Sequence, residues 1–198
     1  MINFINENSE KPYILFREKY YAALKKKQPS IEAISISSYS LNNSEVDSRF
    51  VNLKYLDGKK FIFFTNYDSP KSIQFKSHNQ IAVNIYWQKI NLQIRIKAHI
   101  RKTTKKYNSQ YFSKRSLDKN ALAISSSQSQ PINSYEEVRI NYKNVLKNMN
   151  LVDCPKYWGG FSFIPYYFEF WDGHKSRINK RKVFNKIDGI WKESYLQP

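Results

Sequence analysis

Short alternating segments joined by Asp-Gly turns most limit what this chain can form. In Leu92–Lys97 three aliphatic side chains alternate with three polar ones, which predicts a strand with one buried and one solvated face. Asp57-Gly58 separates the apolar segments 49–56 and 60–64 and predicts a hairpin, and Asp188-Gly189 predicts another near the C-terminus. Hairpins without regular βαβ units favour an antiparallel sheet or barrel over a Rossmann arrangement.

The other segments add helices and further strands. Ser134 and Glu137 match a capping box, and the apolar spacing after them predicts an amphipathic helix. Pro165 interrupts a long β pattern, so we expect an edge or a bulge there. The sequence predicts helices over 12–27 and 134–148, helical pieces within 107–127, and strands around 34–36, 81–87, 161–171, 182–187 and 190–195. We expect one domain over 1–198, with residues 1–10 flexible.

Composition narrows the functional classes. The single Cys154 excludes an intramolecular disulfide, and the absence of a zinc-type Cys/His cluster predicts no metal site. No apolar run is long enough to span a bilayer and no signal-peptide pattern is present, so we expect a cytoplasmic protein without membrane contact. The net charge of +17 suggests nucleic acid as a possible partner. The short basic runs are scattered along the chain, however, which favours a solvated basic surface.

Several motifs, in one order, resemble the pyridoxamine/pyridoxine 5'-phosphate oxidases, a family that binds FMN. The resemblance covers about Lys11 to Pro198. The motifs are Arg49–Lys54, Phe64-Thr65-Asn66, Gln128-Ser129, Trp158-Gly159-Gly160-Phe161, Phe168-Glu169-Phe170-Trp171 and Arg177–Arg181. The resemblance implies a mainly β fold, an antiparallel FMN-binding split β-barrel with peripheral helices. It also implies a homodimer with FMN at the subunit interface.

The resemblance also implies which residues bind FMN. Arg49 and Lys71 match phosphate-binding cations, and Pro70 stands where a second cation is common. Asn66–Lys71 also reads as a helix start whose free N–H groups could face an anion. Arg49 and Lys54 have opposite parity on an ideal strand, so periodicity alone does not put both at one site. The other implied FMN contacts are Lys54, Phe64, Thr65 and Gln93 from one subunit, and Gln128, Ser129, Trp171 and Arg181 from its partner.

The implied substrate contacts are less complete. Tyr111 and Arg115 match residues that hold the substrate phosphate, and Arg177 matches the catalytic arginine that covers the substrate ring. Lys54 would orient that ring. Two positions depart from the family pattern, because Lys119 replaces a phosphate-contacting serine and Asn179 replaces a histidine. A lysine can still pair with phosphate, but an asparagine does not titrate near neutral pH.

Three hypotheses follow. The first is an FMN-dependent oxidase that acts on a small phosphorylated pyridine-type substrate, uses O₂ and releases hydrogen peroxide. The second is a related flavin oxidase acting on another compound, such as a phenazine-biosynthesis intermediate. The third is a flavin- or nucleic-acid-binding protein without turnover.

Overall fold

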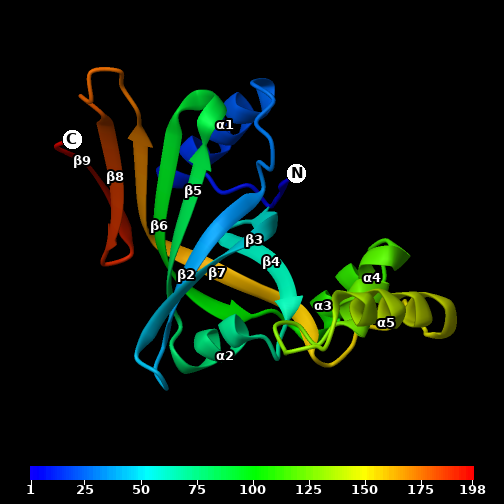
Figure 1. Ribbon diagram of the computed structural model, residues 1–198. Coiled ribbons are helices and arrows are strands. Elements are labelled where there is room, and N and C mark those ends of the chain that lie inside the picture. The colour runs from blue at the N-terminus through cyan, green and yellow to red at the C-terminus, as the bar shows by residue number, and fades with distance from the viewer.

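The computed structural model describes residues 1–198 as a mainly β protein (Figure 1). The elements in chain order are β1 (Asn3–Ile5), α1 (Lys11–Lys25), β2 (Ala33–Ser40), β3 (Glu45–Asp57), β4 (Lys60–Asn66), α2 (Pro70–Ser77), β5 (Gln80–Trp87), the 3₁₀ helix η1 (Gln88–Ile90), β6 (Leu92–Lys102), α3 (Lys105–Phe112), α4 (Leu117–Ser125), α5 (Tyr135–Asn148), β7 (Trp158–Asp172), β8 (Lys180–Ile187) and β9 (Ile190–Leu196). No helix is long and apolar enough to cross a membrane.

The strands close into a barrel. The sheet runs β1-β3-β2-β5-β6-β7-β8-β9, and β4 pairs with both β3 and β7. Because β4 joins these two strands, the pairings β2-β3-β4-β7-β6-β5 return to their starting strand, while β8 and β9 extend from β7. All pairings except the parallel β1–β3 pair are antiparallel. The predicted barrel is confirmed.

The barrel interior is aromatic, and α1 packs against it. Phe16 of α1 lies 5.1 Å from Phe61 and 5.7 Å from Trp87, measured between ring centroids. Phe61 in turn stacks on Phe163 at 5.1 Å. These side chains are fully buried or nearly so, and burying each aromatic ring stabilises the fold by a few kcal/mol. The alternating strands supply this core from their inward faces.

Most local predictions agree with the structure. Both Asp-Gly hairpins form, as β3–β4 and β8–β9. The Ser134 hydroxyl accepts a hydrogen bond from the Glu137 N–H, which confirms the N-terminal cap of α5. The β6–β7 register shifts next to Pro165, which confirms a bulge there. On its other side β7 pairs with β4 up to Phe163 and with β8 from Tyr167, so the proline lies in the gap between these two pairings.

The first ten residues differ from the expectation of flexibility. They contain β1, which pairs with β3 from Tyr55 to Asp57. Ile2 is buried, and its N–H donates to the hydroxyl of Tyr20 at 2.9 Å. The apolar contacts of this segment are made to residues distant in the sequence, so the local polar composition gave no signal for the strand.

Three helices stand apart from the barrel. In Figure 1, α3, α4 and α5 cluster on one side, near the end of β4 and the start of β7. The two glycines after Trp158 let the segment before α3 pack closely against the start of β7. A Cβ added to Gly160 would lie only 2.7 Å from the Thr103 hydroxyl oxygen. The cluster thereby forms a wall beside β3 and β4.

Candidate functional site

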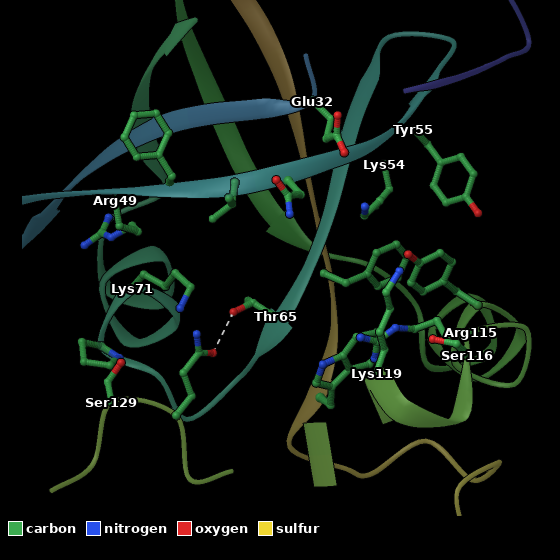
Figure 2. Close-up of a pocket in the computed structure, with 18 of the residues that line it drawn as sticks. Glu32, Arg49, Lys54, Tyr55, Thr65, Lys71, Arg115, Ser116, Lys119 and Ser129 are labelled. Carbon is green, nitrogen blue, oxygen red and sulfur yellow. Dashed lines mark hydrogen bonds between the residues drawn. The ribbon is translucent and has the colours of Figure 1, made fainter. Parts of the chain in front are cut away.

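One cavity of about 850 Å³ lies between β3, β4, the start of α2 and the helical cluster (Figure 2). Ten of the residues predicted to bind cofactor or substrate line it: Arg49, Lys54, Phe64, Thr65, Lys71, Tyr111, Arg115, Lys119, Gln128 and Ser129. Figure 2 shows Arg49, Lys71 and Ser129 on one side and Arg115, Ser116 and Lys119 on the other, with Thr65 between them. The cavity is therefore cationic at two separate places.

Consecutive residues of β3 line the cavity. Residues 49–52 all contribute, so side chains from both faces of the strand reach it. Lys54 sits at a bulge, because the β3–β4 register shifts between Leu53 and Tyr55. Arg49 and Lys54 therefore share the cavity although they differ in parity along the strand.

Arg49 is held firmly by the protein itself. Its Nη1 donates to the Ile36 carbonyl at 3.2 Å and to the Ser38 hydroxyl at 2.6 Å. Its Nη2 donates to Gln74 Oε1 at 2.8 Å and also forms an ion pair with Asp47. Each terminal nitrogen carries two hydrogens, so only Nε–H is left for a ligand in this arrangement. Arg49 contributes chiefly positive charge to the cavity.

Lys71 is the less satisfied cation at this end. It occupies the first turn of α2, and its residue surface is only 7% exposed. Its ammonium group donates one hydrogen bond, to the Ser69 hydroxyl at 3.0 Å. Burial, with a further contribution from Arg49, lowers the pKa of Lys71 to about 8. An anion placed here would compensate a buried charge. The first turn of α2 adds only the Lys71 N–H, because Pro70 has no N–H and the Ser72 and Ile73 N–H groups donate to the Ser69 carbonyl.

Gln128 and Ser129 belong to the same cavity as Arg49 and Lys71. Gln128 Oε1 accepts hydrogen bonds from the Thr65 hydroxyl at 3.2 Å and from the Asn66 N–H at 3.4 Å. Ser129 adopts a left-handed backbone with φ of 69°. The expectation that these two residues reach the site from the partner subunit differs from the structure, because the α4–α5 connection folds back onto the end of β4 of its own chain.

Stacked aromatic rings line the cavity next to Arg115. Phe64 and Tyr111 stack with centroids 3.6 Å apart and an interplanar angle of 8°. Trp158 lies nearly parallel to both, 5.4 Å from Phe64. Flat stacked rings of this kind suit planar ligands. Burial raises the pKa of the Tyr111 hydroxyl, so this group stays protonated.

Arg115 and Lys119 form the second cationic place. The Arg115 guanidinium lies over the Trp158 ring at 4.5 Å from its centroid. Its Nη1 is buried and has no hydrogen-bond partner, which is rare for a buried charged group and points to a missing anion. Burial lowers the pKa of Lys54 nearby, with smaller contributions from Lys119 and Arg115, while Glu32 opposes the shift.

Gln93, Trp171 and Arg181 lie outside this cavity and form a second group. Gln93 of β6 is opposite Trp171 of β7, and Trp171 is opposite Arg181 of β8, so the three residues make one row across the sheet. Gln93 was predicted to act with Arg49 and Lys54. The register instead puts it with the two residues predicted to reach a partner's site.

Arg177 and Asn179 occupy the connection between β7 and β8, also outside the cavity. Arg177 is exposed and has φ of 61°, a strained value for a residue with a side chain. The Asn179 side-chain oxygen accepts a hydrogen bond from the His174 N–H at 3.0 Å. Asn179 therefore shapes the loop that carries Arg177.

Sequence reasoning missed several lining residues. Asp47 lies two residues before Arg49, on the same face of β3, so strand periodicity could have placed it. Trp158 was part of a recognised motif but was given no role at the site. Glu32 gave no signal, because it precedes β2 and meets the cavity only through the β2–β3 pairing.

The donor set fits an organic phosphate at each cationic place. Lys71 offers its ammonium charge and its backbone N–H at one, and Arg115 with Lys119 offers charge and N–H groups at the other. The stacked aromatic rings beside the second place fit a flat ring system. The fold and this cavity together define a split β-barrel built to hold planar, anionic ligands.

Comparison with known proteins identifies the family. The model of "Pyridoxamine 5'-phosphate oxidase" matches residues 16–148, and that of "Pyridoxine 5'-phosphate oxidase C-terminal dimerisation region" matches residues 158–198. A pyridoxine/pyridoxamine 5'-phosphate oxidase of Hydrogenovibrio crunogenus is 34% identical, over 94% of this chain and 88% of the relative. One from Synechocystis is 31% identical, over 97% of this chain and 90% of the relative. The chain belongs to the pyridoxamine 5'-phosphate oxidase family and is an oxidoreductase, and this membership supports a flavin cofactor.

Solved structures confirm the fold. PhzG from Burkholderia lata, in complex with tetrahydrophenazine-1-carboxylic acid, superposes with a TM-score of 0.89 at 21% identity, over 94% of this chain and 92% of that one. A pyridoxamine 5'-phosphate oxidase-related, FMN-binding protein from Nostoc punctiforme superposes with a TM-score of 0.78 at 11% identity, over 96% of this chain and 99% of that one.

Proposed function

We propose that this chain is an FMN-dependent oxidase of the pyridoxamine/pyridoxine 5'-phosphate oxidase type. It acts as a cytoplasmic homodimer on a small phosphorylated pyridine-type substrate, uses O₂ and releases hydrogen peroxide. The observation that carries the proposal is the single cavity with two separate cationic places, the second of which lies beside stacked aromatic rings. Two phosphorylated planar molecules, cofactor and substrate, match that division.

At the cofactor place the chain binds and orients. The ammonium group and backbone N–H of Lys71 take the FMN phosphate, and Arg49 adds charge. Thr65, Gln128 and Ser129 contact the adjoining polar chain. Pro70 supplies no cation, so Lys71 carries more of the binding. FMN, when bound, would supply the redox chemistry, in which two electrons and two protons pass overall from the substrate to O₂ and give H₂O₂.

At the substrate place Arg115 and Lys119 bind the phosphate, and the orphaned Nη1 of Arg115 gains its missing acceptor. Tyr111 and Lys54 orient the ring. Gln93, Trp171 and Arg181 of one copy reach the cavity of the other, and Arg177 covers the substrate and stabilises developing charge. The match to a dimerisation region supports this arrangement.

A second candidate is oxidation of a larger reduced ring system, such as a phenazine-type intermediate. The observation that favours it is the pair of departures from the family pattern, Lys119 in the cavity and Asn179 in the β7–β8 connection. A lysine accepts a carboxylate as readily as a phosphate. The FMN place would be unchanged.

The decisive experiment is purification followed by a visible absorption spectrum and turnover assays. We expect a flavin spectrum, a dimeric mass, and peroxide release with pyridoxine or pyridoxamine phosphate. Faster turnover of a reduced tricyclic carboxylate would favour the second candidate. A colourless protein that binds no added FMN, or one that only binds polynucleotide with steep salt dependence, would refute both.

A further inference from the structure

A buried carboxylate lies outside the cavity, in the motif Phe168-Glu169-Phe170-Trp171. The two phenylalanines are fully buried in the core. Because side chains alternate along a strand, Glu169 and Trp171 share the opposite face of β7. Glu169 is nonetheless only 1% exposed. A carboxylate buried to this degree is stable only with charge partners and hydrogen bonds.

Glu169 has a full set of partners. Its Oε1 accepts a hydrogen bond from Nε of Arg181 at 2.8 Å and lies 2.8 Å from Nη2 of the same guanidinium in an ion pair. Its Oε2 accepts from Arg95 Nη1 at 3.0 Å and from the Tyr167 hydroxyl at 3.0 Å. Arg95 neutralises Glu169 from the solvent side, where half of its side-chain surface is exposed.

These contacts fix the guanidinium of Arg181. A second hydrogen bond runs from its Nη1 to the Gln197 carbonyl at 3.0 Å. A guanidinium has five N–H groups, and only two of them donate hydrogen bonds here, so N–H groups on both terminal nitrogens stay available for a ligand. An arginine held in this way loses less rotamer entropy when it binds a ligand than a freely rotating one does.

We infer that Glu169 is a positioning residue that holds Arg181 in the orientation needed to bind FMN in the cavity of the other copy. The inference rests on the proposed function. Glu169 touches neither cofactor nor substrate and acts only through Arg181. The motif then has two roles. Its phenylalanines build the core, while Glu169 and Trp171 lie on the face of β7 that contributes to the FMN site of the other copy.

The test is a double-mutant cycle on FMN affinity, measured by quenching of flavin fluorescence. We expect Glu169→Gln to weaken FMN binding about tenfold, because the amide offers Arg181 one neutral acceptor in place of a charged one. In an Arg181→Gln background the same change should alter the Kd less than about twofold. Arg95→Gln is the matched control. It removes the other ion pair of Glu169, leaves Arg181 held, and should change the Kd less than about twofold.

Equal effects of Glu169→Gln in both backgrounds, or wild-type affinity in Glu169→Gln, would overturn the inference. Should Glu169→Gln not fold, Tyr167→Phe removes one hydrogen bond from Glu169 and keeps its charge. It should weaken FMN binding about threefold, and only when Arg181 is present; an equal loss without Arg181, or no loss, counts against the inference. Failure of the wild-type protein to bind FMN would instead refute the proposed function.

Discussion

Replacing Lys71 by methionine should stabilise the cofactor-free protein while weakening FMN binding. The pKa of Lys71 falls from 10.5 to about 8 on folding, mainly through burial. At about 1.4 kcal/mol per unit, keeping this ammonium charged in the folded state costs about 3 kcal/mol near neutral pH. Methionine has a similar volume and no charge. The variant should therefore gain up to about 3 kcal/mol in unfolding free energy.

The pH dependence has a defined sign. Between about pH 8 and 10.5 the unfolded chain binds a proton that the folded chain does not. The unfolding free energy of the wild type therefore rises with pH across this window, and the Lys71→Met variant should lose that rise. Urea unfolding of both proteins without FMN, near neutral pH and near pH 10, measures the difference. Lys76→Met, at an exposed position of the same helix, is the control.

FMN binding should respond in the opposite direction. The dianionic phosphate requires a protonated Lys71, so the wild-type Kd should increase as pH rises above about 8, and Lys71→Met should bind FMN about a hundredfold more weakly. If the Lys71→Met variant is less stable than wild type near neutral pH, the charged Lys71 does not lower the unfolding free energy of the cofactor-free protein. The account of the cofactor place would then fail.

Further substitutions test the other parts of the site and the core. Asp47→Asn should release Arg49 and remove a negative charge near the FMN phosphate, tightening FMN binding about fivefold, or about 1 kcal/mol; weaker binding in a titration would contradict the role given to Asp47. Arg115→Met should raise the KM for a phosphorylated substrate at least about tenfold and leave FMN content unchanged; an unaltered KM in steady-state assays would remove Arg115 from the substrate place. Phe61→Ala should lower the unfolding free energy by about 3–5 kcal/mol in denaturant titrations, and a loss under about 1 kcal/mol would mean that the stacked core is not the main source of stability.

Much of the fold could be predicted from local pattern. The Asp-Gly hairpins, the alternation in β6 and the cap of α5 depend on residues close together in the sequence, and each formed as predicted. Strand β1 could not be predicted in this way, because its stability comes from pairing with β3 and from burial of Ile2.

The candidate site shows the same difference between local pattern and long-range packing. The sequence by itself determined which residues are candidates for the chemistry, because ordered motifs and residue types are local properties. Only the tertiary structure decided their grouping. Both faces of β3 contribute to one cavity, so Arg49 and Lys54 share it. Chain folding brought Gln128 to Thr65, and strand register put Gln93 with Arg181. Register and long-range packing are set by the sum of contacts between distant segments, which no single stretch of sequence contains.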